Sequence, residues 1–448
     1  MKKYFGTDGI RGEVGIAPIT PDIILKLAMA LGSFLQEKFP NQNNINILIA
    51  KDTRISSDMI ESALKAGLSA SGVNIKLLGV ISTPALAYFT KIFNAHIGIV
   101  ITASHNNPKY NGIKLFSNHG FKINNETQLY IDKYLYNNIV HYAHFSKIGK
   151  VTQITDIAGR YIEFCKSIVP FGFSLKDYKI VIDCANGAAY NTASIILNEL
   201  GAKVITINNS PNGININKNC GSIFPQEICN SVLQHQADVG ITLDGDADRV
   251  IMCDHNANII NGDQILYIIA KYLKLKNDFY GGVVGTCMSN VILEEKLKQL
   301  HIPFIRSDVG DRNISNMLKK YNWFLGGESS GHIINLNKHV ASDGIISALQ
   351  ILTAMIYLNK SLAELANEII LVPNILHNVY VDNPQQVLQN IEFKTALMQA
   401  KQHAVSKSRI VVRASGTENC IRILLEGKDM KLNKKIVSDL EDSIRKLT

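Results

Sequence analysis

The chain has 448 residues, of which 46% are hydrophobic and 19% are charged, and its formal net charge is +8. This composition is ordinary for a globular enzyme of about three or four domains, and it excludes disordered and collagen-like chains. The Lys and Arg residues are scattered rather than gathered in a basic arm, which favours an anionic small molecule such as a phosphorylated metabolite over nucleic acid.

The first third of the chain alternates short apolar runs with longer segments of helical period. We expect strands at 45–50, 75–78 and 96–101, with helices at 57–71 and 84–93 between them. A βαβαβ alternation implies parallel strands covered by helices.

The same alternation recurs twice and then changes. A second set comprises the segments 179–183, 188–200, 203–207, 225–234 and 238–243, and a third comprises 282–285, 291–300, 303–306, 311–321 and 323–325. After about residue 372, short strands at 410–412 and 421–425 precede a helix from Met430. The predicted fold class is therefore α/β, with three similar α/β domains with mixed sheets, plus a smaller C-terminal α+β domain, around a central cleft. The expected domains are 1–150, 151–255, 256–372 and 373–448.

Cysteine usage and hydropathy indicate a soluble cytoplasmic protein without a membrane partner. The seven cysteines form no CxxC pair, which argues against a disulfide framework or a zinc site. No apolar segment follows the first residues, so no signal peptide is visible. The longest apolar stretch, 345–358, is too short to span a bilayer and predicts a buried helix.

A serine follows the strand predicted at 96–101, in the sequence Thr102-Ala103-Ser104-His105-Asn106. Ligands of open α/β sheets bind beyond the carboxyl ends of strands, so Ser104 is a candidate nucleophile or phosphate carrier. A turn with a capping serine is the alternative. Lys114 adds a cation to the same loop system, either as a point charge for phosphate or as a proton carrier.

Three aspartates, Asp244, Asp246 and Asp248, follow the apolar run that ends at residue 243. Clustered carboxylates repel one another unless a cation lies between them, and oxygen ligands alone select hard ions such as Mg²⁺. A calcium loop of the EF-hand type needs Gly at its sixth position and Glu at its twelfth, where this chain has Arg249 and His255. A solvated acidic turn is the remaining alternative.

Three further glycine-containing segments carry candidate binding groups. In 326–332, Glu328 can accept hydrogen bonds from two sugar hydroxyls, and His332 is a candidate acid or base. In 413–418, arginine, hydroxyl and backbone N–H groups make a phosphate cradle or a polar hairpin turn, with Arg422 nearby. The segment 6–12 carries Arg11 but lacks the Gly-Lys-Ser/Thr of a Walker A loop.

Together and in this order, these motifs resemble the α-D-phosphohexomutase superfamily over essentially the whole chain, and the bacterial phosphoglucosamine mutases within it. The resemblance is carried by FGTDGIRG at 5–12, TASHN at 102–106, NGIK at 111–114, DCANG at 183–187, DGDADR at 244–249, GDR at 310–312, GGESSGH at 326–332 and RASGTE at 413–418. Members of the family have four domains around a central cleft and carry a phosphoserine, so the resemblance implies the same architecture here.

The resemblance also implies a role for each candidate residue. Ser104 would be the phosphoserine, and phosphorylation of Ser104 would be required for activity. One Mg²⁺ per subunit would be held by Ser104, Asp244, Asp246 and Asp248, and the reacting phosphate would be surrounded by Arg11, Lys114, Arg249 and His332. The substrate would be bound by Glu328, Ser330, Arg312, Arg413, Ser415, Gly416, Thr417 and Arg422.

The implied activity is the interconversion of glucosamine 6-phosphate and glucosamine 1-phosphate through a 1,6-bisphosphate, in amino-sugar nucleotide biosynthesis. The implied partner is a hexosamine phosphate, and a homodimer is among the assemblies to be expected. A phosphomannomutase/phosphoglucomutase activity is an alternative, since Ser329 does not settle the substrate. A serine-dependent sugar phosphatase and a catalytically silent sugar-phosphate binding protein are alternatives of other classes.

Overall fold

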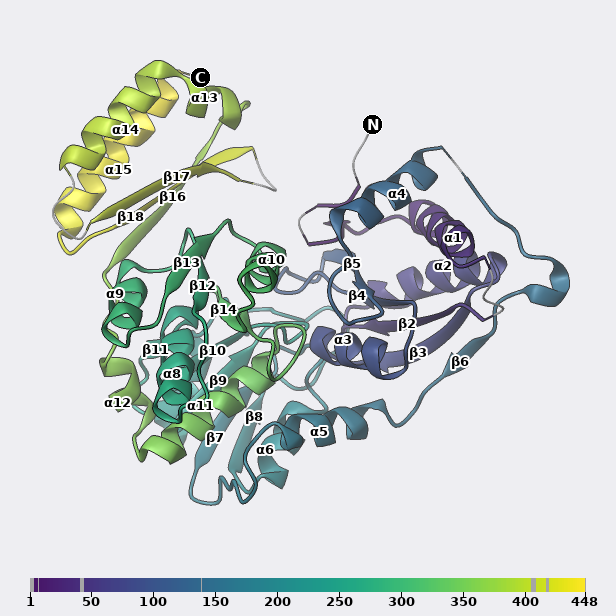
Figure 1. The fold of residues 1–448 in the computed structure, drawn as a ribbon, viewed down its shortest axis with the longest axis horizontal. Coiled ribbons are helices and arrows are strands. Elements are labelled where there is room, and N and C mark those ends of the chain that lie inside the picture. The colour runs from purple at the N-terminus through teal and green to yellow at the C-terminus, as the bar shows by residue number, and fades with distance from the viewer. Residues whose placement is uncertain are drawn as a thin grey trace.

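A computed structural model describes residues 4–6, 8–40, 44–137, 139–403, 408–415 and 419–447. Its sheets have six, five, four and three strands and follow one another along the chain (Figure 1). The predicted fold class, three α/β domains and a smaller C-terminal α+β domain, is confirmed.

The first domain contains a mixed sheet in the order β1-β5-β4-β2-β3-β6. Strands β2, β3, β4 and β6 are parallel, whereas β5 is antiparallel to both β4 and β1. The strands are β1 Ile10–Glu13, β2 Asn46–Lys51, β3 Asn74–Val80, β4 Ile97–Ile101, β5 Tyr110–Ser117 and β6 Val151–Gln153, and the helices are α1 Pro21–Lys38, α2 Ser56–Ala70, α3 Thr83–Ile92, α4 Asn125–Tyr136 and the 3₁₀ turn Phe145–Lys147. The antiparallel strand β5 brings the chain straight back beside the serine segment.

The second domain has the sheet order β11-β10-β9-β7-β8, with β10 antiparallel to β9. Its strands are β7 Lys179–Asp183, β8 Lys203–Ile207, β9 Val239–Leu243, β10 Val250–Asp254 and β11 Ile259–Ile260, and its helices are α5 Ile157–Ser167, α6 Ala193–Glu199 and α7 Gln226–His235. Helix α6 begins later than the predicted residue 188. The reason is that the Ala188 N–H donates to the Gly245 carbonyl at 2.8 Å, so this segment supports the aspartate loop instead of continuing the helix.

The third domain has the sheet order β13-β12-β14-β15, in which β15 is antiparallel to β14. Its strands are β12 Val283–Thr286, β13 Phe304–Ser307, β14 Leu325–Gly327 and β15 Ile333–Asn335, and its helices are α8 Gly262–Leu275, α9 Val291–Gln299, α10 Asp311–Tyr321, α11 Gly344–Leu358 and α12 Leu362–Asn367. Helix α11 is the predicted buried helix, and every residue from Gly344 to Met355 is buried.

The fourth domain has a three-stranded antiparallel sheet in the order β16-β18-β17. Its strands are β16 Asn374–Tyr380, β17 Arg409–Ala414 and β18 Cys420–Glu426, and its helices are α13 Pro384–Gln389, α14 Ile391–His403 and α15 Met430–Arg445. In Figure 1 this domain stands beyond the third domain, with its helices on the outer face of the sheet.

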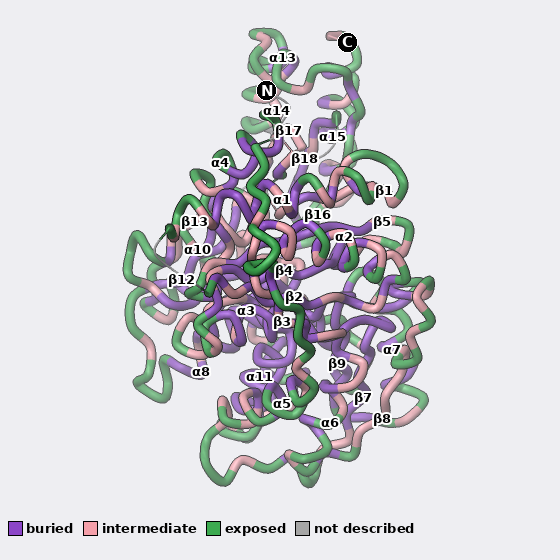
Figure 2. Tube along the Cα trace, turned by 90° about the vertical axis from the view of Figure 1, so that its right-hand side faces the viewer, coloured by how far each residue is buried: buried purple, intermediate pink, exposed green. Residues whose placement is uncertain are grey.

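One hydrophobic core extends through the first three domains, the first domain has a second core of its own, and the fourth domain has a separate one. The shared core contains Phe89 of the first domain, Leu243 of the second and Leu349 of the third, and Figure 2 shows this buried interior beneath exposed loops. The core of the fourth domain forms around residues such as Phe393 and Ile423. None of the helices in the described part of the chain has the length and apolarity that crossing a bilayer requires. The shared core includes residues of β4, β9 and β14, so it packs strands of three domains against one another.

Candidate active site

Ser104 lies in the loop between β4 and β5 and is completely buried. Its φ of 53° is in the left-handed region, which costs a residue other than glycine about 1–3 kcal/mol and persists only when the surroundings hold it. Its N–H donates to Thr102 Oγ1 at 2.9 Å, and its hydroxyl donates to Asp244 Oδ2 at 2.7 Å. His105 Nδ1 lies 3.3 Å from the same hydroxyl. Burial and the charge of Arg249 lower the pKa of His105 to about 3, so this ring is neutral near pH 7.

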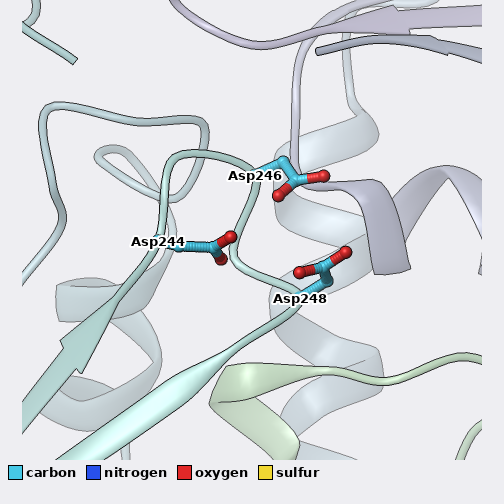
Figure 3. Close-up of side chains that lie close together, drawn as sticks. All are labelled: Asp244, Asp246 and Asp248. Atoms are coloured by element: carbon cyan, nitrogen blue, oxygen red, sulfur yellow. The ribbon is translucent and has the colours of Figure 1, made fainter. Parts of the chain in front are cut away.

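Asp244, Asp246 and Asp248 occupy the loop between β9 and β10, and all three are buried. Figure 3 shows their carboxylates converging across the turn, and one oxygen from each lies within 4.8 Å of the others. Among the described residues, Asp246 Oδ1 and Asp248 Oδ1 are buried without a hydrogen-bond partner. Unsatisfied buried carboxylate oxygens with an all-oxygen donor set fit a hard divalent cation such as Mg²⁺. The residues present therefore fit the metal site that the sequence predicts.

The three carboxylates differ strongly in their surroundings. Burial, together with the charges of Asp248 and Asp246, raises the pKa of Asp244 well above its ordinary value. Burial alone would also raise the pKa of Asp248, but the charges of Lys114 and His332 overcome it and hold that pKa well below its ordinary value. Asp246 Oδ2 accepts hydrogen bonds from Thr83 Oγ1 at 2.6 Å and from Lys114 Nζ at 2.7 Å. Asp246 is thus held by two groups of the first domain.

Lys114 lies on β5, where it is opposite Val100 of β4 and is 1% exposed. Its Nζ is 2.7 Å from Asp246, 3.1 Å from Asp248 and 3.5 Å from Asp8. Burial would lower the pKa of Lys114, but these three carboxylates raise it far above its ordinary value. Lys114 is therefore a fixed cation beside the aspartate triplet.

His332 lies between two carboxylates, with Nδ1 at 3.7 Å from Asp248 and Nε2 at 3.4 Å from Asp311. Burial opposes its charge, yet Asp248 and Asp311 raise the pKa of His332 to about 10. Lys122 Nζ is 2.5 Å from Asp311 and also contacts Asp8. A chain of alternating charges thus connects the first, second and third domains at the site.

Arg11 of the first domain and Arg249 of the second both lie near His105. Arg11 pairs with Asp8, and the Arg249 N–H donates to Asp244 Oδ1 at 3.2 Å. Arg249 Nε is 4.0 Å from Asp248 Oδ1. In the described part of the chain, Nε of Arg11 and Nε of Arg249 are buried without a hydrogen-bond partner. Both guanidinium groups therefore have donor capacity for an anion.

The segment 326–332 turns between β14 and β15 beside the aspartate loop. Gly331 has a φ of 88°, and a Cβ there would lie 2.0 Å from the Val250 carbonyl oxygen, so only glycine fits. Glu328 Oε1 accepts the Gly310 N–H at 2.9 Å, and Ser330 lies half-buried in the turn. Arg312 Nη1 reaches Asn125 at 2.6 Å and Gln128 at 3.1 Å, both on α4. The described contacts of Arg312 thus join the third domain to the first.

The phosphate-cradle candidates are on β17 and β18 of the fourth domain. Arg413 and Arg422 are register partners across these strands, and Arg413 Nη1 donates to the Ala414 carbonyl at 3.3 Å. Ser415 follows β17, while Gly416 and Thr417 lie outside the described residues. The structure thus brings together Ser104, Lys114, His332, Arg11, Arg249 and the aspartate triplet. It places Arg413, Ser415 and Arg422 on a separate domain.

Several residues that support this site lie outside the set of candidates that the sequence motifs indicate. They are Asp8, Arg54, Thr83, Lys122, Asn217 and Asp311. Arg54 and Thr83 come just after β2 and β3, so the strand-end rule that identifies Ser104 would also have selected them. Lys122 and Asn217 belong to loops that carry no such signal.

Comparisons with known protein families identify domains of a single family in all four parts of the chain. Models of phosphoglucomutase/phosphomannomutase alpha/beta/alpha domains I, II and III match residues 2–139, 159–258 and 261–371. The model of the phosphoglucomutase/phosphomannomutase C-terminal domain matches residues 376–443. The four matches follow the order of the four sheets.

Full-length relatives and solved structures were also found. The phosphoglucosamine mutase of Blochmanniella floridana is 48% identical over 99% of this chain and 98% of its own length. That of Histophilus somni strain 2336 is 46% identical over 99% of both. A phosphoglucomutase/phosphomannomutase family protein from Burkholderia thailandensis has a TM-score of 0.82 at 20% identity, covering 99% of this chain and 97% of that one. The N-acetylphosphoglucosamine mutase of Aspergillus fumigatus has a TM-score of 0.69 at 16% identity, covering 99% and 95%.

Proposed function

This chain belongs to the phosphoglucomutase/phosphomannomutase family, and on that premise we propose that it is a phosphoglucosamine mutase. It interconverts glucosamine 6-phosphate and glucosamine 1-phosphate, which supplies amino-sugar nucleotide biosynthesis in the cytoplasm. The observation that carries the proposal is the 2.7 Å contact between the Ser104 hydroxyl and Asp244, within a triplet of buried aspartates. Relatives that are 46–48% identical over nearly their full lengths carry the same enzyme name, which supports glucosamine phosphate as the substrate.

The proposed reaction begins with a phosphoryl group on Ser104 Oγ. The free hydroxyl of the hexosamine phosphate forms a new P–O bond as the bond to Ser104 Oγ breaks, which gives a 1,6-bisphosphate. The bisphosphate turns over within the site, and its other phosphoryl group returns to Ser104. Each transfer conserves the phosphoryl group, and the proton that leaves the attacking hydroxyl returns in the second half of the cycle.

Catalysis of phosphoryl transfer depends mainly on positioning and on charge stabilisation. Asp244, Asp246 and Asp248 would hold Mg²⁺ together with the phosphorylated Ser104, and the ion would neutralise charge on the transferring group. Lys114 is a fixed cation at the same place, and the guanidinium groups of Arg11 and Arg249 can donate to the phosphoryl oxygens.

A general acid/base for the hydroxyl proton must lie within hydrogen-bond reach of it. Lys114 and His332 are the two candidates, and both are buried beside Asp248. The neighbouring carboxylates keep both groups protonated, so the one that serves must give up its own proton before it takes that of the hydroxyl. Comparison of Lys114→Arg with His332→Gln decides between them: loss of the general acid/base lowers kcat with little change in KM, whereas loss of a binding group raises KM.

The sugar and its distal phosphate are assigned to the remaining loops. Glu328 and Ser330 meet the sugar hydroxyls, and Arg312 lies two residues after Gly310, whose N–H donates to Glu328 Oε1. The distal phosphate is assigned to Arg413, Ser415, Gly416, Thr417 and Arg422 of the fourth domain. Bidentate arginine donors together with hydroxyl and backbone N–H groups can hold a phosphate from either end of the sugar, which the turnover of the bisphosphate requires.

The decisive experiment is a coupled assay with glucosamine 6-phosphate, with and without Mg²⁺. Wild-type protein phosphorylated on one residue, as judged by intact mass, should form glucosamine 1-phosphate only when Mg²⁺ is present. Ser104→Ala should lose both the phosphate and the activity. Near-normal turnover by Ser104→Ala would refute the nucleophile assignment.

Two rival activities are tested with the same preparation. A phosphomannomutase/phosphoglucomutase would show a higher kcat/KM for mannose or glucose phosphates than for glucosamine phosphate. A serine-dependent phosphatase would release inorganic phosphate steadily from glucosamine 6-phosphate. The complete burial of Ser104 favours transfer between sugar and serine over release to water.

A further inference from the structure

The backbone carbonyl of Ser104 accepts hydrogen bonds from side chains of two different domains. Arg54 Nη2 of the first domain donates to it at 3.0 Å, and Asn217 Nδ2 of the second domain donates at 2.8 Å. A carbonyl oxygen has two lone pairs, so these contacts saturate it. The position of this peptide group is therefore determined from both sides of the domain junction.

Arg54 is 2% exposed and uses all of its side-chain donors within the protein. Nε donates to Asp52 Oδ2 at 2.8 Å. The other four hydrogen bonds reach the carbonyls of Ser104 at 3.0 Å, Asn106 at 2.8 Å, Asn107 at 2.6 Å and Tyr110 at 3.0 Å. The planar guanidinium group thus fixes four backbone carbonyls of the serine loop relative to one another.

Asn217 lies in the loop between β8 and α7, is 3% exposed and has a φ of 54°. Its Nδ2 donates to the Ser104 carbonyl at 2.8 Å and to the Asn106 carbonyl at 3.0 Å. Because both neighbours are acceptors, the amide nitrogen, not the oxygen, must face the serine loop. The Asn217 N–H donates to the Ala185 carbonyl at 2.9 Å, which ties this side chain to the second domain.

We propose that Arg54 and Asn217 are positioning residues that act as a carbonyl clamp, holding Ser104 Oγ opposite Asp244 during both phosphoryl transfers. The inference rests on the proposed function and adds residues to it. Ser104 has a φ of 53°, and rotation of its peptide group would displace Oγ from Asp244 Oδ2. Asn217 and Asp244 both belong to the second domain. The clamp therefore fixes the position of the serine loop of the first domain relative to the aspartate loop of the second domain.

The test compares Asn217→Gly with Asn219→Gly in full-length phosphorylated protein. Glycine accepts the positive φ at both positions, 54° and 56°, so the backbone is retained while the side chain is removed. Asn219 is exposed and belongs to the same loop, which makes it a matched control. Asn217→Gly should lower kcat ten- to a hundredfold with KM changed by less than about twofold, since displacement of a reacting atom by about 1 Å has effects of that size.

Two further measurements separate positioning from general stability. The ³¹P resonance of the phosphoserine should shift or broaden in Asn217→Gly. It should also change in Asn217→Asp, because this variant places carboxylate acceptors against two carbonyl oxygens. It should not change in Asn219→Gly. A wild-type kcat together with a wild-type ³¹P resonance in Asn217→Gly would overturn the clamp, as would equal losses of kcat and melting temperature in both glycine variants. If wild-type protein had no mutase activity, only the proposed function would be refuted. The ³¹P comparison would still test whether Arg54 and Asn217 position Ser104, because it does not depend on turnover.

Discussion

The Ser104 hydroxyl donates to Asp244 Oδ2 at 2.7 Å, although these residues are 140 positions apart and belong to different domains. Close approach of the two loops makes this contact possible. The loop that follows Asp244 passes so near the serine loop that a Cβ on Gly245 would lie 2.6 Å from the Ser104 carbonyl oxygen. The distance between serine and aspartate therefore depends on the absence of a side chain at position 245.

Replacement of Gly245 by alanine should displace the serine loop from the aspartate loop. The new methyl group would also lie 2.8 Å from Asn217 Nδ2, so it would clash with both atoms of the hydrogen bond between Asn217 and the Ser104 carbonyl. We expect kcat to fall at least tenfold in the coupled assay. Gly159→Ala on helix α5 is the control, since nothing lies within 4 Å of its added Cβ. Equal activity of the two variants would show that the close approach is unimportant.

Asp246→Asn should weaken the binding of a divalent ion. Asp246 Oδ2 is occupied by Thr83 and Lys114, which leaves the unpartnered Oδ1 as the oxygen available to a metal. Replacing a charged ligand by a neutral amide should reduce affinity for Mg²⁺ or Mn²⁺ at least tenfold in calorimetric titrations, and activity should fall with it. Asp58→Asn, an exposed position on α2, serves as the matched change. Activity of Asp246→Asn that survives EDTA would mean that the metal site lies elsewhere.

The sequence predicted most of the parallel strands, because their short apolar runs alternate with segments of helical period. It missed the parallel strand β6 and placed β14 two residues too early. Among the antiparallel strands it missed β5, although Lys114 lies on it. The sequence of segment 110–117 resembles a loop. It forms a strand because it pairs with β4 and with β1, and β1 lies about 100 residues earlier in the chain. Helix α6 was predicted too long because the contact between Ala188 and the Gly245 carbonyl overrides local helix propensity.

The candidate site was predicted as a set of motifs but not as a set of contacts. Strand-end position identified Ser104 and the aspartates, since that signal is local. Asn217 could not be predicted in this way, because its importance lies in an amide that reaches two carbonyls of another domain. Lys122 was likewise missed, since its partners Asp8 and Asp311 are remote in sequence and come from different domains.

Lys122→Met should destabilise the protein by leaving Asp8 and Asp311 without their shared cation. Burial would raise the pKa of both carboxyl groups. However, the charges of Lys114 and Lys122 hold the pKa of Asp8 below its ordinary value, and Lys122 and His332 do the same for the pKa of Asp311. Removing one member of a largely buried ion pair costs about 3–5 kcal/mol. We expect a lower melting temperature by calorimetry, partly restored in Lys122→Met/Asp311→Asn. Lys276→Met, which loses an exposed pair with Asp278, should change stability by less than about 1 kcal/mol.

Two buried carboxyl groups lie where the fourth domain meets the third. Asp263 of α8 accepts the Asn290 N–H at 2.8 Å, and Glu426 of β18 lies 3.5 Å from Arg409 Nη1. In the described part of the chain, Asp263 Oδ1 and Glu426 Oε1 are buried without a hydrogen-bond partner. Burial raises the pKa of Glu426 to about 7 and that of Asp263 to about 6, although Arg306 and Arg409 oppose both shifts. Both groups bind protons more tightly in the folded protein than in the unfolded chain.

The raised pKa of Glu426 makes stability fall as pH rises. Below about pH 4.5 the group is protonated in both states, whereas above about pH 7 folding must bury its charge. Between these limits the free energy of unfolding should decrease by about 1–3 kcal/mol on account of Glu426. Glu426→Gln removes this titration, so its melting temperature should decline less than that of the wild type between pH 5 and about pH 8, as measured by calorimetry. Glu392→Gln, an exposed change in the same domain, should retain the wild-type slope. If Glu426→Gln loses stability as steeply as the wild type, the pH dependence arises from other groups, because the variant has no carboxyl at this position to titrate.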